Sequence, residues 1–133
     1  MRLASIAVIV GLTVACAGAG TPGPAVSATP MPPLPGAVVV TRASDRGTVH
    51  ARVGDTIQVS LGTEYEWRVD APDGVVLAPV RSTDRIGHGT QAIWTAVSPG
   101  TSTVSATGTV ICASGQACIL IALLFTATVA VGP

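Results

Sequence analysis

The sequence predicts an all-β domain, a Greek-key β-sandwich of seven or eight strands. From residue 37 onward, short runs of alternating apolar and polar residues recur at a spacing of roughly ten residues, separated by Gly, Pro, Asp and Ser. Val, Ala, Thr and Gly dominate the composition, and the branched Cβ of Val and Thr suits a pleated strand. No stretch shows helical periodicity with capping residues. These observations favour a sandwich over a helical or mixed fold.

The first segment, residues 1–16, is typical of a bacterial lipoprotein signal peptide. A positively charged start is followed by an apolar stretch over residues 3–14, which is too short to span a membrane as a helix. Ala15 and Cys16 then resemble the end of a lipobox, in which the cysteine is acylated and becomes the first residue of the mature chain. This predicts an exported protein held on the outer face of the cell membrane, with the lipid bilayer as a partner through Cys16. The alternative is signal-peptidase cleavage after Ala17, which gives a secreted protein.

Either route leaves the mature chain with two cysteines, Cys112 and Cys118. An oxidising compartment favours a disulfide between them, and the five intervening residues suit a tight loop between two antiparallel strands. A zinc site formed with the two histidines is the alternative, although the spacing does not match known zinc fingers. We therefore predict a disulfide and no metal site.

Residues 17–36 form a Pro-, Gly- and Ala-rich stretch between the signal and the domain, which spans residues 37–133. The stretch holds six of the ten prolines, and Pro fixes φ and lacks a backbone N–H. It therefore favours extended polyproline II and a semi-rigid tether, with a disordered arm as the alternative.

The strands follow one another in short steps along the domain. Thr56, Gln58 and Ser60 are expected on the outer face of the third strand, opposite an apolar face. Turn residues at 71–74 and 98–100 separate later strands, and Pro79 indicates a strand end or an edge strand. The predicted strands lie at residues 37–41, 48–53, 54–61, 64–70, 75–80, 90–97, 101–109 and 119–131. The side chains expected to point inward include Ile57, Val59, Leu61, Tyr65, Trp67, Val69, Ala92, Trp94, Ala96, Ser102, Val104 and Ala106.

The last predicted strand, residues 119–131, is apolar on both faces in its first half. The inward face is predicted to carry Ile119, Ile121 and Leu123, followed by Phe125, Ala127, Val129 and Val131. The opposite face carries Leu120, Ala122 and Leu124. Either a loop covers this outer stripe, or it is an exposed patch that marks a partner surface.

Three stretches resemble the framework of the chagasin-type inhibitors of cysteine peptidases over residues 47–131. They are GDTIQVSLGTEYEW, GHGTQAIWTAVSPGTSTVSA and FTATVAV, and more loosely they resemble bacterial immunoglobulin-like (Ig-like) domains. The resemblance implies an Ig-like sandwich in which three loops at one end enter the peptidase cleft. In that family the loops carry the motifs NPTTG, GxGG and RPW.

Only part of these motifs is present. The first loop has LGTE without Asn or Pro, the second has GHGT with Thr90 in place of the last glycine, and the third lacks Arg, Pro and Trp. The resemblance implies these candidate partner-binding residues: Gly62, Thr63, Glu64, Gly87, His88, Gly89, Val110 and Ile111.

Charge and motif content exclude several other functions. Seven Arg are balanced by seven acidic residues and there is no Lys, which argues against a nucleic-acid partner. Glu64 and Glu66 lie on one outward strand face, where they are expected to be solvated, and no nucleophile elbow is present. We predict no catalytic residues and no cofactor.

Two function classes follow from the sequence. The first is a lipid-anchored Ig-like binding or structural module of the bacterial cell envelope, whose partner is an envelope component. The alternative is a divergent chagasin-like inhibitor, whose partner is a papain-type cysteine peptidase.

Overall fold

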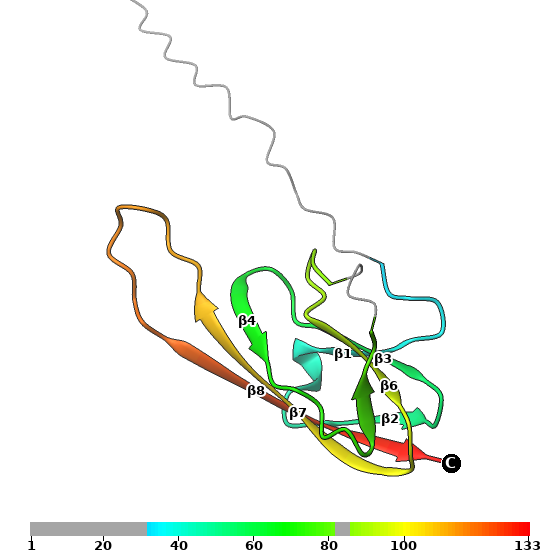
Figure 1. The fold of residues 1–133 in the computed structure, drawn as a ribbon. Helices are drawn as coiled ribbons and strands as arrows, with labels where there is room; N and C mark the ends of the chain where they lie inside the picture. The colour runs from blue at the N-terminus through cyan, green and yellow to red at the C-terminus, as the bar shows by residue number, and fades with distance from the viewer. Residues whose placement is uncertain (1–31, 82–85) are drawn as a thin grey trace, which may run out of the picture.

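The computed structural model describes residues 32–81 and 86–133, which form two four-stranded sheets packed as a sandwich (Figure 1). The strand order is β1-β3-β6-β5 in one sheet and β2-β8-β7-β4 in the other. A 3-10 turn, η1 (Arg42–Ser44), links β1 to β2. The strands are β1 (Val38–Thr41), β2 (Thr48–Arg52), β3 (Thr56–Ser60), β4 (Tyr65–Val69), β5 (Leu77–Pro79), β6 (Ala92–Ala96), β7 (Gly100–Val110) and β8 (Ala122–Gly132). The prediction of an all-β sandwich of seven or eight strands is confirmed.

The predictions for residues 1–16, including acylation of Cys16, concern residues outside the described ranges, as does most of the predicted tether. Within residues 32–81 and 86–133, no helix is long and apolar enough to cross a membrane.

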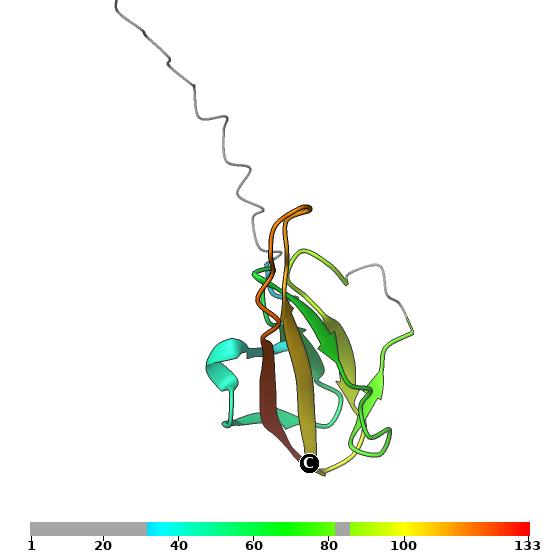
Figure 2. The same cartoon turned by 90° about the vertical axis from the view of Figure 1, so that its left-hand side faces the viewer.

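Strands β7 and β8 form the longest hairpin, and they run side by side in both views (Figure 2). Their antiparallel register extends from Gly100↔Val131 to Thr109↔Ala122. On its other side β8 pairs in parallel with β2, but only from Thr128 onward. The outer half of β7 pairs instead with β4, from Tyr65↔Val110 to Val69↔Ala106, so that only the hairpin tip beyond this ladder projects past the sandwich (Figure 1).

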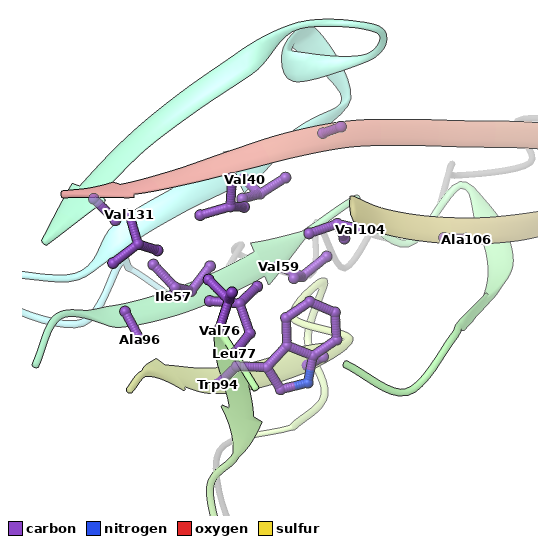
Figure 3. Packing of buried hydrophobic residues seen from close by; sticks show 14 of the residues in the cluster. Val40, Ile57, Val59, Val76, Leu77, Trp94, Ala96, Val104, Ala106 and Val131 are labelled. Carbon is purple, nitrogen blue, oxygen red and sulfur yellow. The ribbon is translucent and has the colours of Figure 1, made fainter. Parts of the chain in front are cut away.

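Apolar side chains from both sheets meet in one core (Figure 3). Trp94 from β6 packs there against aliphatic residues, and Pro79 ends the edge strand β5 as predicted. The inward faces predicted for β6, β7 and the second half of β8 are all buried. The buried residues of the core include Val40, Ile57, Val59, Leu61, Leu77, Ala92, Trp94, Ala96, Val104, Ala106, Phe125, Ala127, Val129 and Val131.

The start of the last strand was predicted wrongly. Strand β8 begins at Ala122 rather than at residue 119, and Ile119 and Ile121 are exposed rather than inward. The ladder with β7 ends at Ala122, so the preceding residues have no strand partner. In Figure 1 the hairpin tip extends beyond the strands of the facing sheet, and the side chains of Ile119 and Ile121 are both more than half exposed.

Trp67 of β4 reaches across the neighbouring strand because Gly108 of β7 has no side chain. A Cβ placed on Gly108 would lie 2.8 Å from the indole ring. The indole meets Phe125 of β8 edge-on with ring centroids 6.5 Å apart, and it meets Tyr65 at 5.8 Å. These contacts fix the start of β4, where the chain leaves the β3–β4 loop.

Asp73 organises the connection between β4 and β5, at the opposite end of the strands from that loop. Its Oδ1 accepts hydrogen bonds from the backbone N–H groups of Val75, Val76 and Leu77 at 2.6, 2.7 and 3.3 Å. The Ser102 hydroxyl and these backbone N–H groups lower the pKa of Asp73 from 3.8 to about 2. The ionised carboxylate is therefore part of the folded turn.

Candidate functional site

Three connections gather at the end of the molecule opposite the carboxyl terminus, and we call them the loop edge (Figure 1). They are the β3–β4 loop (residues 61–64), the described part of the β5–β6 loop (residues 86–91) and the tip of the β7–β8 hairpin (residues 111–121). All three join strands that end on this side of the sandwich. The edge therefore contains the loops that the sequence analysis singled out.

The β5–β6 loop ends in a tight turn over residues 87–90. Gly87 and Thr90 exchange backbone hydrogen bonds of 2.8 and 3.0 Å. The two residues between them have positive φ, 49° for His88 and 95° for Gly89, as the central residues of a type I′ turn require. This conformation leaves the His88 side chain exposed at the end of the turn.

The turn is joined to the β3–β4 loop by a network centred on Gln91. The Gln91 Oε1 atom accepts a hydrogen bond from the Leu61 N–H, and its Nε2 donates to the Gly62 carbonyl, both at 2.7 Å. The Gly62 N–H donates to the Gly89 carbonyl at 3.2 Å. A Cβ on Gly89 would lie 3.6 Å from the Gly62 Cα, so the two loops are in close contact. Two of the three predicted loops therefore act as one unit.

A buried hydrogen bond between Gln58 of β3 and Thr90 supports these two joined loops. The Gln58 Nε2 donates to the Thr90 Oγ1 at 2.9 Å, and the Gln58 Oε1 accepts from the Leu34 N–H at 2.9 Å. The expectation that Gln58 faces water is wrong, because its exposed fraction is 1%. The segment before β1 covers it and supplies the N–H that its amide needs. The hydrogen bond from the Leu34 N–H to Gln58 therefore holds the end of the predicted tether beside the loop edge.

Glu64, at the end of the β3–β4 loop, is held by η1. Its Oε2 forms an ion pair with the Arg42 Nη1, and the Arg42 guanidinium lies 5.3 Å from the centroid of the Tyr65 ring. The Arg42 side chain is about half exposed and that of Glu64 mostly exposed, so the pair contributes little to stability and mainly sets orientation. Glu64 therefore presents no unpaired charge at the edge.

The hairpin tip is the third part of the edge. The structure joins Cys112 and Cys118 in a disulfide with a Cα–Cα distance of 5.8 Å. Val110 and Ile111 are exposed beside it, and so is the outer stripe at Leu120, Ala122 and Leu124. The predicted disulfide is present, and of the two possibilities for that stripe the structure shows the exposed one.

Sequence reasoning missed Gln91 and Arg42. Their partners lie 29, 30 and 22 residues away along the chain, so no local pattern marks them. Among residues 32–81 and 86–133, no three His, Cys, Asp or Glu side chains gather into a possible metal site.

Comparison with known proteins identifies the fold. No protein-family model matches the chain, and no curated protein does. The crystal structure of the cysteine protease inhibitor EhICP2 from Entamoeba histolytica does match, with a TM-score of 0.50 and 18% identity. The match covers 71% of this chain and 94% of the inhibitor. The chain has the fold of a cysteine protease inhibitor.

The solution structure of amebosin also aligns, with a TM-score of 0.43 and 18% identity, covering 72% of this chain and 98% of that protein. The match to the crystal structure of EhICP2 confirms, at the level of fold, the likeness to the chagasin-type framework that the sequence suggested.

These comparisons correct the first prediction of function. An envelope binding or structural module was preferred because the inhibitory loop motifs are mostly missing, and that preference is wrong because the structural match is to a protease inhibitor. The prediction that the chain is not an enzyme agrees with this match.

Proposed function

We propose that this protein is an inhibitor of papain-type cysteine peptidases and that it binds them through the loop edge. One observation carries the proposal: three loops lie at the same end of a sandwich that shares its fold with a cysteine protease inhibitor. The alternative prediction from the sequence thereby becomes the preferred one.

The loop edge is suited to bind a cleft without being cleaved. A peptidase attacks a peptide bond that is held in a defined geometry against its nucleophile. To extend into such a cleft, residues 87–90 would have to break the two hydrogen bonds of their turn. The turn is also anchored to the β3–β4 loop through Gln91. The turn at residues 87–90 and the β3–β4 loop therefore meet the enzyme already ordered, which lowers the entropic cost of binding.

The described part of the edge is nearly free of net charge. Glu64 is neutralised by Arg42, and no Asp, Glu, Lys or Arg occurs from residue 86 to the end of the chain. Binding therefore relies on shape, backbone hydrogen bonds and apolar contact. We expect an affinity for the peptidase that changes little with salt concentration.

The proposal includes export and anchoring. Residues 1–16 carry the signal features described above, and acylation of Cys16 would hold the inhibitor on the outer face of the cell membrane. A tether in polyproline II extends by about 3 Å per residue, so residues 17–33 give the domain a reach of roughly 50 Å from the bilayer. An anchored inhibitor would act on peptidases outside the cell.

Substitutions at Gln91 test the role of the loop edge. Gln91→Ala removes both hydrogen bonds to the β3–β4 loop, whereas Gln91→Glu keeps an acceptor for the Leu61 N–H and loses the donor to Gly62. We expect the dissociation constant for papain to rise about tenfold in the alanine variant and less in the glutamate variant. Val75→Ser, at an exposed position in the β4–β5 connection, is the matched control and should bind as the wild type does. Equal affinities for all four proteins would contradict the proposal.

A further inference from the structure

The tip of the β7–β8 hairpin is the most apolar exposed surface among the described residues. Leu120 is 97% exposed and Ile119 72%, and Ile111 and Ile121 are each more than half exposed. Leu124, in the adjoining start of β8, is 78% exposed. The run 119–121 is a tight turn, in which the Ile121 N–H donates to the Ile119 carbonyl at 3.0 Å, and all three of its apolar side chains are more than half exposed. Monomeric proteins rarely leave such a patch uncovered unless it has a partner.

The surface of the tip is hollowed beside the disulfide. One hollow of about 300 Å³ and one of about 170 Å³ share Cys112, Cys118, Ile119 and Ile121 as lining residues. Ile111 lines the larger hollow and Leu120 the smaller one. Apolar side chains therefore flank the disulfide together with concave surface that a partner can fill.

The backbone of the tip favours a protein over a lipid partner. Within residues 111–121 the internal backbone hydrogen bonds are Gln116 N–H to the Ala113 carbonyl and Ile121 N–H to the Ile119 carbonyl. The other backbone polar groups of this segment need water or a partner with donors and acceptors. Hydrocarbon supplies neither, and an irregular loop is therefore poorly suited to enter a bilayer. A protein cleft can cover the apolar side chains and also satisfy the backbone.

The disulfide is the main constraint on the shape of the tip. The ladder between β7 and β8 ends at Thr109↔Ala122, and the covalent bond between Cys112 and Cys118 closes the chain beyond it. Cys112 is exposed and Cys118 partly so. A dithiol can therefore reach the bond and reduce it to two thiols, while its own two thiols become a disulfide.

We propose that the disulfide-closed tip is the part of the loop edge that determines affinity for the peptidase, by seating Ile111, Ile119 and Leu120 against apolar cleft walls. This inference rests on the proposed inhibitory function. It adds a redox dependence: reduction of Cys112–Cys118 lowers affinity without unfolding the sandwich, because the core lies wholly outside the tip.

Binding to papain tests the inference with four proteins: the wild type, Leu120→Ser, Cys112→Ser/Cys118→Ser and the control Val75→Ser. The peptidase is activated with thiol and then desalted, so that the disulfide stays intact. Loss of a buried leucine contact should raise the dissociation constant about tenfold or more, and the double cysteine variant should match it. Wild-type protein that has been reduced, alkylated and desalted should behave like the cysteine variant. Val75→Ser should bind as the wild type does, and all four proteins should keep the far-UV spectrum of the folded domain.

The outcomes separate the two proposals. Equal binding by the wild type and both tip variants overturns this inference and leaves the inhibitory function standing. No binding by the wild type to any papain-type peptidase overturns both. Binding to phosphatidylcholine vesicles that is lost in the Leu120→Ser variant overturns the assignment of the tip to a protein cleft.

Discussion

The contact between Trp67 and Gly108 provides a sharp test of the packing beneath the loop edge. Alanine in place of a strand glycine ordinarily stabilises a protein by about 0.5–1 kcal/mol, because the unfolded chain loses freedom. The φ of Gly108 is not positive, so the backbone itself tolerates a side chain. Propensity alone therefore predicts that Gly108→Ala raises the melting temperature.

The structure predicts the reverse. The added Cβ would lie 2.8, 2.9 and 3.0 Å from three carbons of the Trp67 ring, well inside the usual contact distance of about 3.5–4 Å. The indole has Tyr65 and Phe125 against it, which limits how far it can move. Overpacking of this kind costs about 1–3 kcal/mol, which exceeds the gain in propensity. We expect a net loss of about 1 kcal/mol, or a fall in Tm of about 4–8 °C.

Thermal unfolding followed by circular dichroism measures this effect. Gly132→Ala is the control, because its nearest neighbour would be the Ala51 carbonyl oxygen at 3.9 Å, and its Tm should stay unchanged or rise. In a protein that already carries Trp67→Leu, the substitution Gly108→Ala should destabilise the fold much less than it does in the wild type. The difference between the two destabilisations, the coupling energy, should be about 1–2 kcal/mol. An increase in Tm for Gly108→Ala, or the same cost with and without Trp67, would refute the reasoning.

Three further predictions concern the turn, the tip and the anchor. The lowered pKa of Asp73 makes its carboxylate stabilise the fold above about pH 4, and this contribution is lost as the pH falls towards 2. The difference in Tm between the wild type and Asp73→Asn should therefore shrink between about pH 4 and pH 2. A difference that does not change with pH would contradict this. Loss of the loop-closure entropy of the Cys112–Cys118 disulfide would destabilise the fold by about 2 kcal/mol, or roughly 8–16 °C in Tm. Reduction should lower Tm by less than this, because the tip also gains freedom in the folded state. A larger fall would show that the tip supports the core. Cys16→Ala should abolish labelling by radioactive fatty acid and release the protein from the membrane fraction or leave it as unprocessed precursor, whereas a wild-type mature start at Gly18 would indicate plain secretion.

The alternation of apolar and polar residues was sufficient to predict most of the sandwich. A strand with one buried face must alternate, and the inward residues of β6 and β7 could therefore be named from the sequence. The run at 119–121 is apolar at every position, so alternation there cannot show where the facing sheet ends. The exposure of Ile119 and Ile121 depends on the length of the other sheet, which is a property of the whole fold.

The candidate site was predictable only where its chemistry is local. Gly87-His88-Gly89 indicates a turn because glycine tolerates positive φ, and both glycines have it. The link from Gln91 to the β3–β4 loop joins strands that become neighbours only after β3 pairs with β6. Gln58 likewise alternates as an outward residue, and its buried contacts are with Leu34 and Thr90, which lie 24 and 32 residues away along the chain.

The inhibition constant of the purified protein against papain-type peptidases, measured over a series of substrate concentrations, tests the central claim most directly. The account predicts competitive inhibition at about micromolar concentrations or below, since a loop edge seated in the cleft excludes the substrate. It also predicts that the inhibitor is recovered uncleaved after prolonged incubation. Absence of inhibition across a panel of such peptidases, or inhibition that does not weaken as substrate is raised, would contradict the claim.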